Sequence, residues 1–151
     1  EGLEWKLIEG DFLATMHLAE PPDLIFYDMF SGKTCAPAWT TEAFRALTGA
    51  CAGRDVELFT YTCSTASRVA MLAAVFYVAR GRNAGDKEET TIAFTCLDNG
   101  RERQREMLGA EWLKKWERSS AKFPACITAS EQSVFEETIR SHPQFFMRAD
   151  D

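Results

Sequence analysis

The sequence predicts an α/β fold built on a mostly parallel β-sheet that ends in an antiparallel hairpin. Up to residue 96, segments with the apolar pattern of strands alternate with segments that have the spacing of helices. Alternation of this kind joins parallel strands by helical crossovers and covers both faces of the sheet. The last two expected strands are separated by only a short polar turn, so they pair antiparallel. The chain has 151 residues, 46% of them hydrophobic, which is enough for one packed domain.

Five strands are expected because their residues are mainly apolar, β-branched or aromatic. They are residues 5–9, 23–28, 55–63, 76–80 and 89–96. The second is a nearly continuous apolar run between two aspartates, which is typical of a strand buried on both faces.

Helices are expected between the strands and beyond the last one, several of them preceded by residue types that cap helix N-termini. They are residues 12–19, capped by Asp11; 40–53, with Thr40 or Thr41 as the cap; 64–75, with Ser64 or Thr65 as the cap; 101–116; and 130–140, where Ser133 and Glu136 have the spacing of a capping box.

The character of the sequence changes after residue 96, where strands give way to charged helices. We therefore expect a first unit of residues 1–96 and a helical extension of residues 97–151. In the extension, Trp112 and Trp116 stand four residues apart and form an apolar stripe on a charged helix. This stripe either docks on the sheet or contacts a partner.

The charge balance limits how the chain can bind nucleic acid. The net charge is −6 and the pI is near 5.0, whereas proteins that bind mainly through phosphate contacts are usually basic. RNA binding would therefore need a local basic patch. Lys33, Arg80, Arg82 and Lys87 lie in or beside expected loops, where they either form such a patch or are scattered surface charges.

Cysteine and histidine content argues against a metal site or a disulfide framework. The chain has five cysteines without a C-x-x-C pair and two histidines, so we expect no metal. Free thiols are typical of the reducing cytoplasm, where we expect the protein. No apolar run reaches the roughly 18 residues of a membrane-spanning helix, so we expect no membrane. The G-K-T triplet at residues 32–34 lacks the earlier glycine of a phosphate-binding loop.

Candidate site residues follow from the expected topology. Ligands of open α/β sheets bind beyond the carboxyl ends of the strands. Gly10 and Asp11, Asp28 to Phe30, and residues 60–64 stand at those ends. Asp28 is the strongest candidate because it closes an apolar strand; the alternative is that it caps the following loop through backbone N–H groups.

Several segments resemble the motifs of one methyltransferase family. Residues 28–31 (DMFS) and 36–44 (APAWTTEAF) are similar to its D-x-F-x-P and P-x-x-W-T-x-E-x-F motifs, and residues 60–68 (TYTCSTASR), 76–81 (FYVARG) and 85–88 (GDKE) resemble later motifs in the same order. The family is the MnmC-type S-adenosylmethionine-dependent methyltransferase of tRNA 5-methylaminomethyl-2-thiouridine biosynthesis. The resemblance covers residues 3–96. It implies a Rossmann-like class I methyltransferase sheet, S-adenosylmethionine as cofactor, and N-methylation of the aminomethyl group of a modified wobble uridine in tRNA.

The same resemblance implies that residues 1–96 are the C-terminal portion of the methyltransferase domain, lacking its first two strands. The family's Gly-rich turn and the acid that ends its second strand are absent, and the chain opens with Glu1. The missing strands would lie beside residues 23–28, which then form a sheet edge. We therefore expect this piece alone to be inactive, with the rest of the domain or an FAD-dependent oxidoreductase domain as partner. Val75 stands where the family usually has glycine, and the first proline of the motif after Asp28 is missing.

For the cofactor, the resemblance implies contacts with Gly10, Asp11 and Asp28. Asp11 would accept a hydrogen bond from the adenine amine, and it can also cap the helix that follows. Asp28 would lie beside the sulfonium methyl group and the substrate amine, where it orients the amine and eases proton loss as the catalytic residue.

For the substrate, the resemblance implies contacts with Phe30, Tyr61, Arg68 and Lys87. Phe30 would stack on an extruded uridine or pack on its own loop. Tyr61 would line the substrate side or be buried in its strand. Arg68 would reach a phosphate or pair with an acid of the fold. Trp39 is expected to hold the loop against the following helix.

Two other functions remain open from the sequence. The missing Gly-rich turn favours a cofactor-free interaction or RNA-binding module of the same fold. The acidic pI favours a methyltransferase of this fold that acts on a small molecule.

Overall fold

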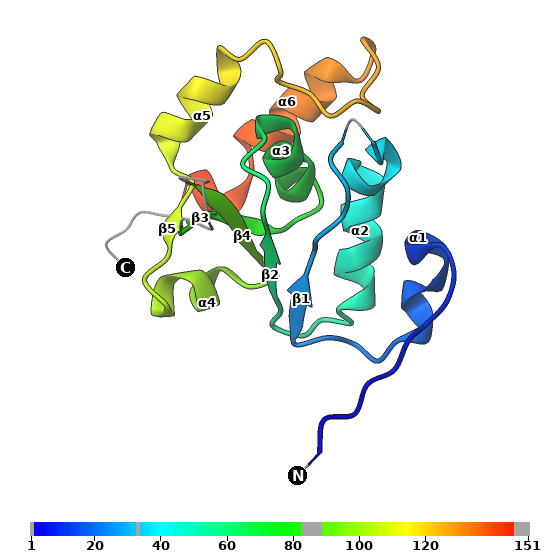
Figure 1. Ribbon diagram of the computed structural model, residues 1–151. Helices are drawn as coiled ribbons and strands as arrows, with labels where there is room; N and C mark the ends of the chain where they lie inside the picture. Colours follow the sequence, from blue (N-terminus) through cyan, green and yellow to red (C-terminus); the bar gives the residue numbers. More distant parts are fainter. Residues whose placement is uncertain (1, 33, 83–88, 147–151) are drawn as a thin grey trace.

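The computed structural model describes residues 2–32, 34–82 and 89–146, and within them a five-stranded sheet has the order β1-β2-β4-β3-β5 (Figure 1). The strands are β1 (Leu24–Phe26), β2 (Glu57–Thr60), β3 (Tyr77–Gly81), β4 (Thr90–Phe94) and β5 (Glu106–Met107). β1 pairs parallel with β2, while β4 pairs antiparallel with both β2 and β3, and β5 pairs antiparallel with β3. β1, β2 and β3 therefore run in one direction, which confirms the α/β sheet that ends in an antiparallel hairpin.

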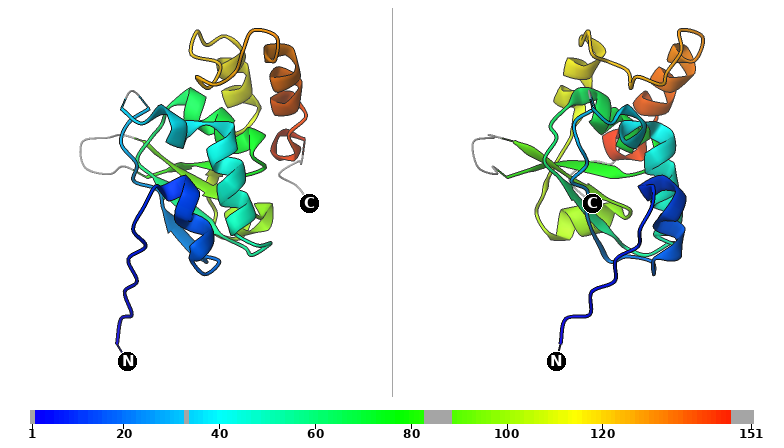
Figure 2. Two further views of the ribbon diagram at one scale, coloured as in Figure 1. Left: turned by 90° about the vertical axis from the view of Figure 1, so that its right-hand side faces the viewer. Right: turned by 45° about the vertical axis from the view of Figure 1, so that its right-hand side comes forward.

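Helices cover the two faces of the sheet unequally (Figure 2). They are α1 (Phe12–Thr15), α2 (Thr41–Ala50), α3 (Thr65–Ala73), α4 (Leu97–Glu102), α5 (Ala110–Glu117) and α6 (Gln132–Arg140), with 3-10 turns η1 (Met16–Leu18), η2 (Ala36–Trp39) and η3 (Pro143–Phe145). The main core joins Leu58, Val78 and Ala93 on one face to residues of α2, α3, α5 and α6. A smaller cluster around Ile92 and Phe94 lies on the other face, which α4 covers in part.

The first three helices begin at the predicted caps. Asp11, Thr40 and Ser64 each accept a hydrogen bond from the backbone N–H three residues later, at 3.1, 3.2 and 3.5 Å. These bonds satisfy donors that the first turn of a helix leaves unpaired.

The extension packs on the same core as the sheet. Trp112, Trp116 and Ile139 are buried in the main cluster. The buried Gln144 side chain accepts a hydrogen bond from the Val78 N–H (2.7 Å) and donates to the Val78 and Leu108 carbonyls (both 2.8 Å). These bonds tie the end of the extension to β3 and to the segment after β5, where the C-terminal part lies beside the sheet (Figure 1).

The expected strand at residues 5–9 is wrong for the described structure. Leu3, Trp5 and Leu7 alternate as strand residues do, but the segment is irregular, exposed and extends away from the body (Figure 2). An extended segment becomes a strand only when another strand satisfies its backbone groups, and β1 pairs only with β2 among the described residues. β1 is the sheet edge, as expected, but it is not buried on both faces, because the Phe26 side chain is 75% exposed.

The expected helix at residues 101–116 is also wrong: α4, β5 and α5 take its place. Gln104 has a φ of +51°, which ends α4, and Arg103 and Arg105 both pair with the buried Glu57. Residues 106 and 107 then pair with β3, so tertiary contacts override the helical pattern. The capping box expected from Ser133 and Glu136 is also wrong, because α6 starts after Glu131, which makes no side-chain cap; its carboxylate accepts from the Thr128 N–H at 2.9 Å.

Val75 ends α3 in a conformation that glycine adopts far more readily. Its φ is +70°, its N–H donates to the Leu72 carbonyl (2.9 Å), and the Phe76 N–H donates to the Met71 carbonyl (3.0 Å). These two bonds define a Schellman cap, whose left-handed position favours glycine. A β-branched residue is strained at such a φ, by roughly 1–2 kcal/mol.

We expect Val75→Gly to raise the free energy of unfolding by about 1 kcal/mol, because the Val75 side chain is 61% exposed and little burial is lost. Chemical denaturation checks this value. Val134→Gly is the matched control, since Val134 is equally exposed but lies within α6, where glycine should lower stability by about 1 kcal/mol. Equal destabilisation by both changes would contradict the strain at Val75.

Candidate functional site

The candidate site lies at one edge of the sheet, where several strands end or begin together. β1, β2 and β3 point the same way, so their carboxyl ends share this edge, and β4 starts there at Thr90. Asp28, Tyr61 and Arg82 follow the ends of β1, β2 and β3. Open α/β sheets bind their ligands at such an edge.

Asp28 lies in a cavity of about 370 Å³ at this edge, which we call the edge cavity. Its lining residues are Phe26, Tyr27, Asp28, Phe59, Thr60, Tyr61, Thr90 and Thr91. The exposed Asp28 carboxylate makes no hydrogen bond or ion pair with any residue that the structure describes, so the alternative role as a loop cap is not seen. The buried hydroxyl of Thr60 also lacks a partner among those residues.

Two aromatic side chains hold the backbone that follows Asp28. The Tyr61 hydroxyl donates to the Met29 carbonyl at 2.8 Å, and the Trp39 indole N–H donates to the Phe30 carbonyl at 2.7 Å. Trp39 thus holds the loop, as predicted. Because both donors belong to the sequence motifs shared with the family, the motifs themselves fix the position of Asp28.

A buried tyrosine anchors the other side of Asp28. The Tyr27 hydroxyl donates to the Ala38 carbonyl, and its ring contacts Phe12, Trp39 and Phe44 at centroid distances of 5.4–5.9 Å. Burial, aided by nearby Cys35, raises the pKa of the Tyr27 phenol, so it remains a neutral donor. Asp28 therefore projects from a rigid aromatic cluster.

Gly10 and Asp11 form the entry to α1, whose Phe12 ring contacts Tyr27 at 5.9 Å. Gly10 has a φ of +139°, and a Cβ atom there would lie 2.7 Å from the Thr15 side chain, so only glycine fits. One Asp11 oxygen caps α1 while the carboxylate stays exposed. Capping therefore leaves Asp11 accessible to a ligand.

A second cavity, of about 380 Å³, adjoins the edge cavity and shares Tyr61 with it; we call it the loop cavity. It is lined by the aromatic residues Trp39, Tyr61 and Phe123 and by Ser31, Gly32, Ala36, Thr62, Ser64, Ala66, Ser67, Pro124 and Ala125. Phe30 is 77% exposed, so it does not pack on its own loop. Phe123 escaped the sequence analysis, where Phe123-Pro124 marked only a break between helices.

The structure places Arg68 in an ion pair. Its buried guanidinium lies 2.6 Å from Glu89 and donates to the Thr91 hydroxyl (2.9 Å) and the Thr90 carbonyl (2.8 Å). Of the two roles expected for Arg68, the structure therefore shows the pairing with an acid of the fold. Arg80 and Arg82 are exposed beside a further cavity that Arg103 and Arg105 also line. Lys33 and Lys87 lie outside the described residues.

Histidine and cysteine contribute little to the site. Burial lowers the pKa of His142 to about 4, and its ring packs on Tyr77 and Phe145, far along the chain from Asp28. All five cysteines are free. In the part of the chain that the structure describes, no cluster of three or more candidate metal ligands occurs, and no helix has the length and apolar character needed to cross a bilayer.

The fold and this site define a class of protein. A mixed α/β sheet with a carboxylate held at the carboxyl end of its edge strand is typical of open α/β proteins that bind a ligand at that edge. A family model for S-adenosyl-L-methionine-dependent methyltransferases matches residues 1–95, and the chain belongs to this family.

A solved structure extends the comparison to the fold of the extension. The chain is similar to MnmC2 from Aquifex aeolicus, with a TM-score of 0.63 and 21% sequence identity, over 93% of this chain and 45% of that chain. The chain thus spans less than half the length of that protein. No curated protein matches it. The family match and this fold confirm the resemblance to an MnmC-type methyltransferase domain.

We expect Tyr61→Phe to loosen the loop after Asp28, because it removes the donor to the Met29 carbonyl. The free energy of unfolding should fall by about 1 kcal/mol, and the amides of residues 29–31 should exchange faster with deuterium. Tyr77→Phe is the control: it removes the same hydroxyl from β3, where that hydroxyl bonds to no described residue. Equal protection of the loop in both variants would contradict the anchoring role.

Proposed function

We propose that the chain carries the acceptor side of a methyltransferase that methylates the aminomethyl group of a modified wobble uridine in tRNA. The observation that carries this proposal is the exposed Asp28 carboxylate, which pairs with no described residue and is held at the carboxyl end of β1 by motif residues. Membership of the S-adenosylmethionine-dependent family supports the reaction type. The wobble uridine itself rests on the resemblance of residues 28–88 to the MnmC motifs.

Asp28 has a clear chemical role in such a reaction. A primary amine attacks a methyl carbon only through its neutral form, so an ammonium substrate has to lose a proton before the N–C bond forms. The Asp28 carboxylate accepts a hydrogen bond from the amine, aims its lone pair, and takes this proton directly or through water. Tyr61 and Trp39 keep the carboxylate in that position by fixing the backbone behind it.

The residues at the edge fit part of the cofactor. When bound, S-adenosylmethionine supplies a methyl group already activated by a positively charged sulfonium. Asp28 and the stacked rings of Phe26 and Phe59, 5.7 Å apart, provide a carboxylate and aromatic faces that suit a cation. The unpartnered Thr60 hydroxyl can donate there, and Gly10 and Asp11 would border the adenine.

The substrate base would enter the loop cavity, where Tyr61, Trp39 and Phe123 offer aromatic surfaces. The exposed Phe30 ring stands ready to stack on an extruded uridine. Lys87 is kept in this proposal as a phosphate contact, although it lies outside the described residues. Arg68 acts through its pair with Glu89 and shapes the wall of the site.

We also propose that residues 1–96 form the C-terminal portion of the methyltransferase domain and that residues 97–151 complete its substrate side. The 151 residues contain no G-x-G sequence, so the Gly-rich turn would come from another segment or subunit. An FAD-dependent oxidoreductase domain remains a possible partner of the complete enzyme. Five free thiols suit the cytoplasm.

In the full polypeptide that carries these residues, Asp28→Asn should lower kcat for methyl transfer to tRNA roughly 100- to 10,000-fold, since it removes the proton acceptor while keeping the shape. Asp23→Asn is the matched control at the other end of β1, where Asp23 pairs with Arg54 at 3.1 Å. Radiolabelled methyl transfer measures both. If Asp28→Asn stays within about threefold of the parent, Asp28 is not the catalytic residue.

The 151-residue chain alone should bind S-adenosylhomocysteine roughly a hundredfold more weakly than the full polypeptide, because the hydrogen bonds of a Gly-rich turn are missing. Isothermal titration calorimetry measures both affinities. Equal affinity would show that the chain holds a complete cofactor site. No binding by either protein would favour the cofactor-free RNA-binding module of the same fold.

A further inference from the structure

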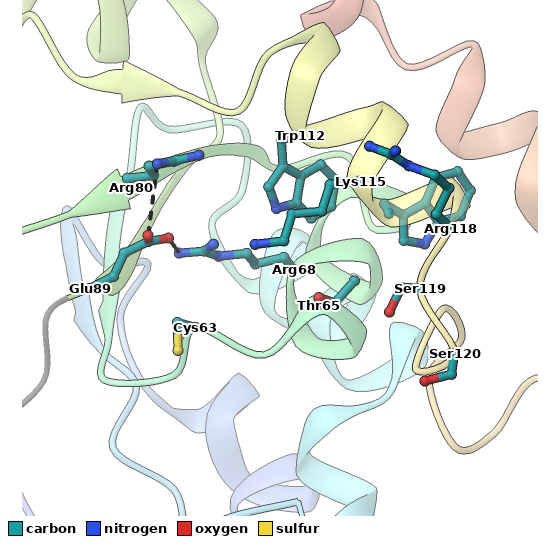
Figure 3. A pocket seen from close by; sticks show the side chains of 11 residues that line it. Cys63, Thr65, Arg68, Arg80, Glu89, Trp112, Lys115, Arg118, Ser119 and Ser120 are labelled. Carbon is teal, nitrogen blue, oxygen red and sulfur yellow. Dashed lines mark ion pairs between the residues drawn. The ribbon is translucent and has the colours of Figure 1, made fainter.

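A further cavity lies between the sheet and the extension, and it shares no lining residue with the edge cavity. It has a volume of about 690 Å³, and we call it the basic cavity (Figure 3). Arg68 and Thr65 line it from α3, Arg80 from β3, and Trp112, Lys115 and Arg118 from α5 and its end. Neither the sheet nor the extension makes this cavity alone.

Positive charge in the basic cavity is only partly neutralised. Among the described residues, Glu89 is the single acid that lines it; its carboxylate lies 2.6 Å from Arg68 and 3.9 Å from Arg80. Lys115 makes no ion pair with a described residue, and the Arg118 Nε–H donates to the Lys114 carbonyl at 3.2 Å. Two cations are thus left for a ligand, in a chain whose net charge is −6.

The walls of the basic cavity suit a phosphate group. Figure 3 shows Lys115 extending from α5 toward Arg68 of α3, while the Arg118 side chain turns back along α5. Hydroxyls of Thr65, Ser119 and Ser120 also line the cavity. The buried Trp116 indole donates to the Lys122 carbonyl at 2.8 Å, so the floor beneath these side chains is fixed. Cations and hydroxyls on a rigid floor match the charge and acceptor oxygens of a phosphate.

The basic cavity opens on the same edge of the sheet as Asp28. In the sheet register, Thr60 of the edge cavity lies opposite Thr91, and Thr91 lies opposite Arg80 of the basic cavity. Two strand spacings separate Thr60 from Arg80, which is about 10 Å. Arg80 and Glu89 also line the next cavity along, where Arg82 and Arg105 continue the positive surface.

We infer that the basic cavity binds a backbone phosphate of the RNA substrate, a few nucleotides from the base that receives the methyl group. This inference rests on the proposed function for its choice of RNA over a free anion. It gives the extension a role, since Lys115 and Arg118 complete the phosphate site. It also explains how an acidic chain can hold RNA, because the contact needs only a local set of cations.

The test compares Lys115→Ala with Lys114→Ala, which removes the same charge one residue away. Lys114 pairs with Glu111 at 2.8 Å and does not line the basic cavity. Fluorescence anisotropy of a labelled anticodon stem-loop RNA gives the affinity of the 151-residue chain at several salt concentrations, without cofactor. Lys115→Ala should weaken binding about fivefold near 0.1 M salt and reduce the salt slope by about 0.7–0.9, because one phosphate contact is lost. Lys114→Ala should change both values far less.

Three outcomes would overturn the inference. Equal losses of RNA affinity in Lys115→Ala and Lys114→Ala would mean that only the overall charge matters and not the cavity. If the parent chain binds no RNA, the cavity takes no RNA. The third outcome concerns inorganic phosphate, whose binding is followed through the fluorescence of Trp112 and Trp116. If phosphate saturates the cavity and fully displaces the RNA at the same concentrations, the cavity is assigned to a free anion. If Lys115→Ala behaves as expected but no methyl transfer to tRNA is found, the phosphate site stands and the proposed reaction fails.

Discussion

The structure of the site depends on two hydrogen bonds to carbonyls that no regular element satisfies. Tyr61 and Trp39 donate to the carbonyls of Met29 and Phe30, directly after the edge strand. A loop backbone without such partners would be mobile, and a carboxylate on it would be poorly aimed. Because Tyr61 follows β2 and Trp39 precedes α2, the two donors also lock the sheet, the loop and the helix layer together. The geometry that our proposal requires of Asp28 and the stability of the fold therefore depend on the same contacts.

The direction of the strands gathers the chemistry at one place. β1, β2 and β3 all end at the edge where Asp28, Tyr61 and Arg80 stand, and β4 enters there with Thr90 and Thr91. The buried Arg68 bonds to both threonines and to Glu89, so one guanidinium links the wall of the edge cavity to the basic cavity. The edge cavity, where we propose methyl transfer, and the basic cavity, where we propose phosphate binding, are thus linked through the buried Arg68.

Sequence patterns predicted those parts of the fold that depend on interactions between residues close together in the chain. The alternation of strands and helices, the hairpin and the caps of α1 to α3 follow from apolar runs and polar residues at helix starts. The sequence could not show that residues 5–9 lack a pairing partner, nor that Glu57 draws Arg103 and Arg105 out of a helical pattern. At the site, Asp28 and Trp39 were identified from motifs. Phe123 and Lys115 belong to tertiary contacts between distant segments, which no local pattern reports.

The exposed edge of the sheet and the Gly-rich turn that our proposal assigns to another segment have one geometric explanation. A strand added parallel to β1 would cover Phe26 and satisfy the backbone groups that β1 leaves unpaired. Its carboxyl end would then stand beside Asp28, and the turn after it would face the edge cavity. That turn is where a Gly-rich segment must lie if its N–H groups are to hold a cofactor against Asp28. The edge that leaves aromatic surface open to water is therefore the place where, in our proposal, a second half of the cofactor site would be built.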